Sequence, residues 1–257
     1  MPGNVAPLPL RILRLTRLLI HLLAGLWIVR LHYPRMSPQR RRQMVRAWSR
    51  RLLRILAISV HAEALPAALP GRCMLVTNHI SWLDIFVIDS LHPAIFVAKS
   101  EIRSWPLVGW LCARVGTLYI ERGKGASARR LKERLTHSLA SGVLIAVCPE
   151  GVTTYGRTLK RFHAALFQPV IDAAATLQPV ALRYQDPQGR HTDAAGYVGE
   201  TSLLESTWRI VSARRIIARV EFLGLLPAEG ETRRTLAGKA EGAIAAALGV
   251  AAPQPRR

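Results

Sequence analysis

The sequence predicts an α/β protein in which a mixed sheet is flanked by helices and preceded by an N-terminal membrane-associated helical pair. Three observations support this fold class. Short β-rich apolar runs alternate with helical stretches after residue 63. The first 62 residues are basic and apolar, with no Asp or Glu among them. Half of the 257 residues are hydrophobic, which is enough to build one sizeable core.

The net charge narrows the class of partner. The chain has 36 Lys and Arg residues against 16 Asp and Glu residues, a formal net charge of +20 at pH 7. Such an excess indicates an extended anionic partner, which is either nucleic acid or the anionic headgroups of a membrane. Charge alone does not choose between these two partners.

The first expected helix contains the apolar run 18–29, LLIHLLAGLWIV, with Arg11, Arg14 and Arg17 before it and Arg30 after it. This run is shorter than the roughly 20 residues of a perpendicular membrane span, so spanning the bilayer and lying in it both stay open. A secretory signal is the other interpretation, but no clean A-x-A cleavage site follows and the next segment is again basic. We expect a retained membrane element.

The second expected helix covers residues 37–60 and is amphipathic. Arg recurs at every fourth position, and apolar side chains occupy another face: Arg42, Arg46, Arg50 and Arg54, against Val45, Trp48, Leu52 and Ile55. The pattern suits a helix in the headgroup layer, and it also suits a solvated helix packed on the domain. Beside the first helix, the membrane interpretation is favoured. The positive-inside rule then predicts the cytoplasmic face of the inner (plasma) membrane.

The remaining residues are expected to form an α/β domain over 63–250, followed by a frayed tail over 251–257. The composition changes after Pro66 and Pro70, where acidic residues appear, and this change indicates a boundary near residue 63. The predicted strands are 73–77, 95–98, 117–120, 143–148, 179–184 and 216–223, and the predicted helices are 82–91, 126–140, 161–175 and 232–248.

Candidate catalytic residues follow the first predicted strand of this domain, in the segment Asn78-His-Ile-Ser-Trp-Leu-Asp84. Positions five apart meet only if the chain turns between them, and Ser81 fits the N-cap of a helix that has Asp84 in its first turn. Helical side chains lean toward the N-terminus, so Asp84 would point back at His79. An imidazole oriented by a carboxylate can act as a general base toward a hydroxyl group.

Simpler interpretations of the same residues exist. Asp84 also suits a helix N-terminus, where it would complement the helix dipole, and His79 also suits an ordinary loop. Ser81 lacks the G-x-S-x-G setting of a nucleophile, and no further ligand stands at metal-binding spacing nearby, so no metal is expected. Cys73, Cys112 and Cys148 have no C-x-x-C spacing and are interpreted as small buried apolar residues.

Four ordered blocks resemble the glycerolipid (lysophospholipid) acyltransferase family, which includes the 1-acylglycerol-3-phosphate acyltransferases. The first is N-H-x-x-x-x-D over 78–84. The second, Gly116-Thr-Leu-Tyr-Ile-Glu-Arg122, resembles G-x-x-[FY]-I-x-R. The third, Cys148-Pro-Glu-Gly-Val-Thr-Thr154, resembles F-P-E-G-T, and the fourth is the Pro-containing strand Gln178-Pro-Val-Ala181. The resemblance covers roughly residues 72–185.

The resemblance implies a function and a set of site residues. His79 and Asp84 would be catalytic, and Arg122, Glu150, Gly151, Asn78 and Gly116 would line the substrate site. A fatty acyl group would move from acyl-CoA or acyl carrier protein, with no cofactor, to the free hydroxyl of a lysolipid. The first candidate acceptor is 1-acyl-sn-glycerol-3-phosphate, which would give phosphatidic acid. Backbone N–H groups around residues 78–81 are the expected oxyanion donors.

The third block departs from the family pattern, because Val152 and Thr153 stand where Thr and Arg are common. Losing that Arg weakens the case for a phosphomonoester acceptor, although Arg157, Lys160 or Arg161 could replace its charge. The stretch 161–167 also resembles bacterial enzymes that acylate lyso-ornithine lipid, which is the alternative acceptor.

Two non-enzymatic classes are the alternatives. A nucleic-acid-binding protein would need a known motif or stacking aromatics on an exposed basic face, and none is present, so no nucleic acid is expected. A catalytically inactive membrane scaffold is opposed by the intact pair His79 and Asp84. Membrane lipids, the lysolipid acceptor and the acyl donor are the expected partners, and the sequence does not predict an oligomeric state.

Overall fold

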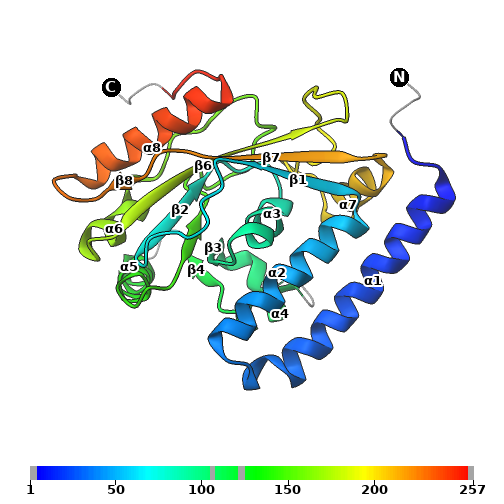
Figure 1. The fold of residues 1–257 in the computed structure, drawn as a ribbon, viewed down its shortest axis with the longest axis horizontal. Coiled ribbons are helices and arrows are strands. Elements are labelled where there is room, and N and C mark those ends of the chain that lie inside the picture. The colour runs from blue at the N-terminus through cyan, green and yellow to red at the C-terminus, as the bar shows by residue number, and fades with distance from the viewer. Residues whose placement is uncertain (1–4, 105–107, 121–124, 254–257) are drawn as a thin grey trace.

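The computed structural model describes residues 5–104, 108–120 and 125–253. Its centre is one twisted eight-stranded sheet in the order β1-β7-β6-β2-β5-β3-β4, with β8 paired to β6 (Figure 1). The strands are β1 Ile58–Glu63, β2 Cys73–Thr77, β3 Ile95–Lys99, β4 Leu118–Ile120, β5 Ile145–Val147, β6 Thr176–Gln185, β7 Ile216–Phe222 and β8 Leu226–Pro227. The sheet is mixed, as predicted, because β6 pairs antiparallel with β7 and β8 whereas the other neighbours run parallel.

Helices cover both faces of the sheet (Figure 1). They are α1 Leu8–Leu31, α2 Pro38–Ile55, α3 Leu83–Leu91, α4 Val108–Arg114, α5 Gly125–Ala140, α6 Gln168–Asp172, α7 Leu203–Ser212 and α8 Arg233–Leu248, with short 3-10 turns at Tyr33–Arg35, Ser100–Ser104 and Ala164–Phe167.

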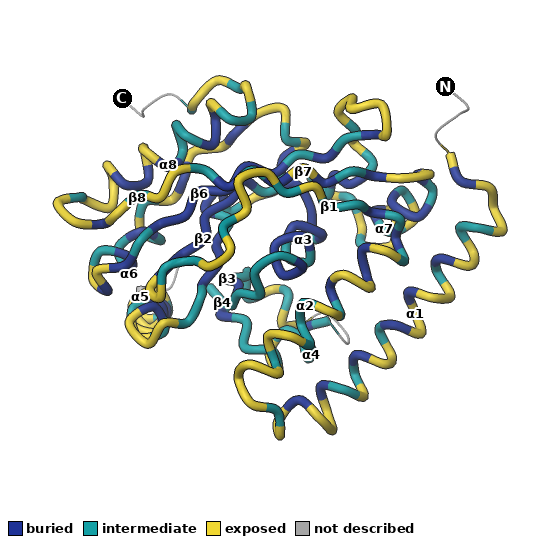
Figure 2. Tube along the Cα trace, in the orientation of Figure 1, coloured by how far each residue is buried: buried dark blue, intermediate teal, exposed yellow. Residues whose placement is uncertain are grey.

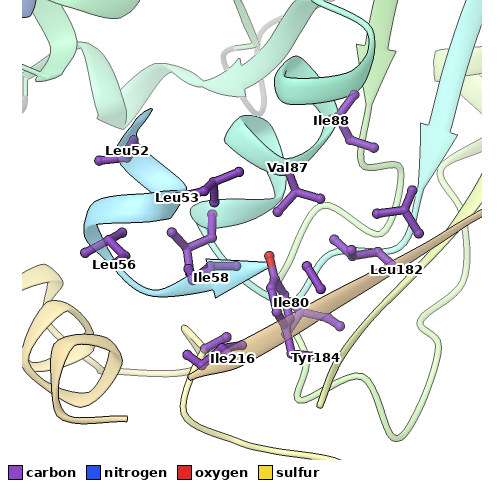
Figure 3. Close-up of a cluster of buried hydrophobic side chains, with 14 of the residues drawn as sticks. Leu52, Leu53, Leu56, Ile58, Ile80, Val87, Ile88, Leu182, Tyr184 and Ile216 are labelled. Carbon is purple, nitrogen blue, oxygen red and sulfur yellow. The ribbon is translucent and has the colours of Figure 1, made fainter. Parts of the chain in front are cut away.

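The alternation of side chains along β2 explains why this layered arrangement forms. All five residues of β2 are buried, and successive side chains of a strand point to opposite faces. Met74 and Val76 pack in a core with α5, α6 and α8. Leu75 packs in a second core with α2, α3 and α7, part of which Figure 3 shows around Tyr184. A central strand buried on both faces reads as a continuous apolar run, and Cys73–Thr77 is such a run.

The N-terminal helices α1 and α2 form a hairpin beside the second core. The buried face of α1 carries Arg14, Leu18, His21, Gly25 and Val29, spaced three or four residues apart as one helix face requires. The remainder of α1 is largely exposed (Figure 2). Its large exposed apolar side chains include Leu8, Ile12, Leu19, Ile20, Leu23 and Trp27. By length and composition α1 could cross a membrane, and an apolar N-terminal helix of this kind associates with lipid.

Several element boundaries differ from those predicted. The helix expected over 37–60 ends at Ile55, because Ala57 adopts a left-handed backbone (φ 55°) and turns the chain into β1. The first strand of the sheet therefore begins before the expected boundary at residue 63. The helix expected over 161–175 is only a 3-10 turn followed by the five-residue α6. The helices α4 and α7 and the strands β1 and β8 were not predicted.

Candidate active site

His79 and Asp84 meet beyond the carboxyl end of β2. The His79 Nδ1 atom lies 2.8 Å from the Asp84 Oδ2 atom, and the Asp84 side chain is fully buried whereas that of His79 is 24% exposed. The chain turns at Ser81, whose carbonyl accepts a hydrogen bond from the Asp84 N–H. The helix α3 begins at Leu83, with Trp82 rather than Ser81 at the N-cap, although the Ser81 hydroxyl accepts a bond from the Leu83 N–H. The predicted pairing therefore forms, one residue from the predicted cap.

The Asp84 carboxylate is fixed by four hydrogen bonds. Its Oδ2 atom accepts hydrogen bonds from the N–H groups of Ile80 and Ser81, at 2.8 and 3.0 Å. The same atom is bonded to His79 Nδ1. Its Oδ1 atom accepts the hydroxyl of Tyr184 at 2.8 Å. Burial and the adjacent carboxylate raise the pKa of Tyr184 well above its ordinary value, so the phenol stays a donor. Tyr184 comes from β6 and was not predicted as a site residue.

Glu150, predicted at the acceptor site, accepts hydrogen bonds from the backbone of the loop that carries His79. It is buried; its Oε1 atom accepts the His79 N–H at 2.7 Å and its Oε2 atom accepts the Lys160 N–H at 2.8 Å. Burial raises the pKa of Glu150 to about 7, and the two N–H donors oppose that rise. Contact with the lysolipid by Glu150 stays a prediction.

Asn78 holds two strands together at the same edge of the sheet. Its Oδ1 atom accepts the Leu182 N–H at 2.8 Å, and its Nδ2 atom donates to the Leu182 carbonyl at 2.9 Å. The side chain thus continues the β2–β6 pairing beyond Thr77, where β2 ends. Contact of Asn78 with the substrate stays a prediction.

The two glycines of the predicted substrate site both turn the chain. Gly116 (φ 97°) separates α4 from β4, and Gly151 (φ 68°) follows β5, where its N–H donates to the Cys148 carbonyl at 3.2 Å. Both lie in the left-handed region that favours glycine. Arg122, the remaining predicted residue, lies outside the described residues.

Cys148 interacts with His79 and is only partly buried, so its interpretation as a small buried apolar residue is wrong. The strands β2 and β5 pair in parallel with Val76 opposite Val147, so both chains leave the sheet at the same edge. Burial lowers the pKa of His79, but the Cys148 sulfur and the Asp84 carboxylate raise it, and the net result lies well above the ordinary value. The proline that follows Cys148 in the sequence marks the end of a strand. No local sequence pattern indicates that Cys148 interacts with His79.

The expected oxyanion donors are largely engaged elsewhere. The N–H of His79 donates to Glu150, and those of Ile80 and Ser81 donate to Asp84. The prediction that these backbone groups form the oxyanion hole is wrong for these three residues. They are used to shape the loop, because a tight turn carrying a buried carboxylate needs its N–H groups as partners.

Within the described residues, no three His, Cys, Asp or Glu side chains are grouped closely enough to hold a metal ion. The chemistry that this site supports is proton transfer. Because Nδ1 of His79 is held by Asp84, the other ring nitrogen is the atom that can take a proton from a substrate hydroxyl.

A carboxylate-oriented histidine beyond a parallel strand of an α/β sheet has the geometry that a general base requires. The acyltransferase family model matches residues 57–183. A lyso-ornithine lipid O-acyltransferase from Pseudomonas aeruginosa is 36% identical over 84% of this chain and 83% of its own length. A 1-acyl-sn-glycerol-3-phosphate acyltransferase from Neisseria meningitidis is 35% identical over 82% of this chain and 83% of its own length. The chain belongs to the acyltransferase family, and it is an acyltransferase.

The fold has a solved counterpart. The crystal structure of the 1-acyl-sn-glycerophosphate (LPA) acyltransferase PlsC from Thermotoga maritima superposes with a TM-score of 0.66 and 17% sequence identity, covering 92% of this chain and 96% of that one. This similarity confirms the predicted fold class, with a mixed sheet, flanking helices and an apolar N-terminal helix.

Proposed function

We propose that this acyltransferase moves a fatty acyl group from acyl-CoA or acyl carrier protein to the free hydroxyl of a lysolipid, with 1-acyl-sn-glycerol-3-phosphate as the first candidate acceptor. The observation that supports this function is the contact of 2.8 Å between His79 Nδ1 and a fully buried Asp84 carboxylate. The buried carboxylate fixes the tautomer and favours the imidazolium that forms when the base takes a proton.

The proposed reaction is direct transfer. His79 removes the proton of the lysolipid hydroxyl, and the oxygen attacks the thioester carbonyl of the donor. The ester C–O bond forms and the C–S bond breaks, while the donor leaves as a thiolate that takes the proton from His79. No acyl group is covalently attached to the enzyme at any stage.

Cys148 permits a direct test of this order of events, because its thiol interacts with His79 and a thiol beside a histidine can act as a nucleophile. Under direct transfer, Cys148→Ser keeps most of the activity, and mass spectrometry of enzyme mixed with donor alone finds no acylated protein. An acyl adduct on Cys148 that passes to the acceptor would overturn direct transfer while leaving the acyltransferase function intact.

Lyso-ornithine lipid is the second candidate acceptor, and one group of contacts favours it. The hydroxyl of Thr153, at the position where the family commonly has Arg, donates to the Tyr197 carbonyl. Arg157, a candidate replacement cation, is paired with Asp193 at 2.9 Å. A phosphomonoester therefore finds less positive charge in this block than the family pattern would provide.

We also propose that the enzyme works at the cytoplasmic face of the inner membrane. The basic residues on both sides of the apolar run 18–29 support this location, because positive flanks stay on the cytoplasmic side. The exposed apolar side chains of α1 would bring the site to the lipid surface from which a lysolipid enters.

The test is release of free thiol from acyl-CoA mixed with a panel of lysolipids, repeated with acylated carrier protein as donor. We expect release only with an acceptor that has a free hydroxyl, and its loss in His79→Ala. His163→Ala, in which an unrelated histidine is removed, is the matched control. A folded His79→Ala protein with normal transfer to every lysolipid would refute the proposed base. The acceptor that gives the highest kcat/KM decides between the two candidates.

A further inference from the structure

A cavity of about 480 Å³ lies between α1 and α2, and its lining residues all belong to these two helices. They are Arg17, Ile20, His21, Ala24, Arg51, Arg54 and Ile55. The cavity is thus separate from His79 and Asp84, and its lining combines three guanidinium groups with an apolar wall. A ligand that matches it must carry negative charge and hydrocarbon in the same molecule.

The three guanidinium groups have no carboxylate partner in the described part of the chain. No acidic residue occurs before Glu63, and the ion pairs of the described residues include none of Arg17, Arg51 and Arg54. Three like charges around one cavity repel one another, and an anion placed among them removes that repulsion.

His21 contributes a buried polar atom that also needs a partner. The residue is 5% exposed, and its ring stacks on Trp48, with ring centroids 4.4 Å apart. Its Nε2 atom has no hydrogen-bond partner among the described residues. Buried polar atoms are normally paired, so an unpaired nitrogen on a residue that lines the cavity points to a ligand.

The protonation state of His21 specifies the kind of partner. Burial lowers its pKa, a hydrogen bond to the backbone of Trp48 raises it, and nearby Arg51 lowers it further, with the net direction downward. The ring is therefore neutral at pH 7. A neutral imidazole offers one acceptor nitrogen, so a ligand hydroxyl group is a partner that suits the unpaired Nε2 atom.

We propose that this cavity binds one anionic phospholipid whose headgroup carries a hydroxyl, such as phosphatidylglycerol. The phosphodiester lies among Arg17, Arg51 and Arg54, and the headgroup hydroxyl donates to His21 Nε2. The acyl chains follow Ile20 and the exposed Leu19 and Leu23 of α1. Basic pockets between membrane-associated helices bind lipid headgroups in this way. This site is distinct from the acceptor site and does not depend on the proposed acceptor.

The experiment measures binding without any acyl transfer. Full-length protein in neutral detergent is titrated with short-chain phosphatidylglycerol below its micelle concentration, so that diffuse attraction to a charged bilayer does not contribute. Short-chain phosphatidylethanol, a phosphodiester without the headgroup hydroxyl, and inorganic phosphate are the comparison ligands. We expect phosphatidylglycerol to bind about fivefold more tightly than phosphatidylethanol, since one neutral hydrogen bond is lost, and inorganic phosphate not to displace it.

Two variants locate the site. The triple variant R17Q/R51Q/R54Q should bind phosphatidylglycerol at least about tenfold more weakly than R35Q/R40Q/R42Q, which loses the same charge from the same hairpin outside the cavity. His21→Phe keeps the stacking on Trp48 and should abolish the preference over phosphatidylethanol. Thermal unfolding establishes that each variant is folded.

Three results would overturn the proposed lipid site. Equal weakening in the two triple variants would mean that the charge acts as a diffuse surface. Displacement by inorganic phosphate would assign the cavity to free anions rather than lipid. An unchanged preference for phosphatidylglycerol in folded His21→Phe would remove His21 from the site.

Discussion

At the scale of single residues, the Cys148 sulfur and the fully buried Asp84 carboxylate, which contacts the His79 ring nitrogen, both raise the pKa of His79. With the pKa of His79 raised well above its ordinary 6.5, the base is protonated and inactive at low pH. We therefore expect kcat/KM to increase with pH through a midpoint above 6.5. A profile of kcat/KM against pH measures this, and a midpoint below 6.5 would contradict it.

Asp84→Asn provides the matched variant for that profile. The amide removes one of the two interactions that raise the pKa of His79, the other being with Cys148, so the midpoint should move to lower pH. Activity should also fall by about 10³-fold, in the range of losses when an oriented general base loses its carboxylate. Circular dichroism is the control for folding, because the introduced amide cannot accept every N–H that the Asp84 carboxylate accepts.

A variant of Glu150 can distinguish its two possible roles, positioning of the His79 loop and binding of the acceptor, which the sequence could not distinguish. If its carboxylate positions the loop through the His79 and Lys160 N–H groups, Glu150→Gln should lower kcat about 10- to 100-fold with little change in KM. The loss corresponds to one charge-assisted hydrogen bond. Steady-state kinetics with the exposed Glu200→Gln as control measure it. A raised KM for the lysolipid with unchanged kcat would instead support acceptor binding.

At the scale of elements, one buried cation adds a polar anchor to the packing that holds α1 against the domain. Arg14 is 7% exposed and donates to the carbonyls of Val211, Ala213 and Arg214 at 2.8, 2.6 and 2.9 Å, at the C-terminal end of α7. A cation there also complements the helix dipole. The apolar helix is thereby held along the protein instead of being free to leave it.

Arg14→Met should weaken the attachment of the N-terminal part of α1 to α7 without disrupting the sheet. Each buried carbonyl left without a donor costs about 1–3 kcal/mol, so the loss totals several kcal/mol. Hydrogen exchange should become faster in α1 and at the end of α7 and stay slow in β2 and β5. The exposed Arg30→Met on the same helix is the control, and equal exchange in the two variants would show that Arg14 does not anchor the hairpin.

The elements also show which parts of the fold local patterns predict. The strand over 73–77 was predicted at its observed bounds, because a central strand needs an uninterrupted apolar run. The helix over 37–60 was predicted too long, because residues 58–60 continue its apolar pattern but pair with β7 instead. That partner lies more than 150 residues away, and its pairing leaves no mark on local periodicity.

At the scale of the whole molecule, charge and exposed apolar surface act together on a membrane. The net charge of +20 attracts anionic lipid, with about 1 kcal/mol for each Lys or Arg near the surface. Binding to anionic vesicles should weaken as salt rises from about 0.1 M to about 1 M, because the Debye length falls from about 10 to about 3 Å. Co-sedimentation with vesicles measures this.

The contribution of the exposed apolar side chains of α1 to vesicle binding should persist at high salt. Trp27 and Leu23 are 69% and 48% exposed on α1, and changing both to Ser should reduce the residual binding. Leu225→Ser, at a similarly exposed site outside the hairpin, should not. Binding that salt abolishes completely, with no effect of the Trp27 and Leu23 changes, would mean that α1 does not enter the lipid.

The sequence by itself determined the acyltransferase family, the α/β class and the pairing of His79 with Asp84. The family followed from the resemblance of four ordered sequence blocks. The α/β class followed from the alternation of apolar runs with helical stretches, and the pairing of His79 with Asp84 followed from an apolar strand, a turn and a carboxylate in the first turn of a helix. Only the tertiary structure decided what Glu150 and Asn78 contact, that Tyr184 and Cys148 join the site, and that the loop N–H groups are occupied. Those contacts join residues about 70 to 100 positions apart, and a single sequence does not encode such distances in any local pattern.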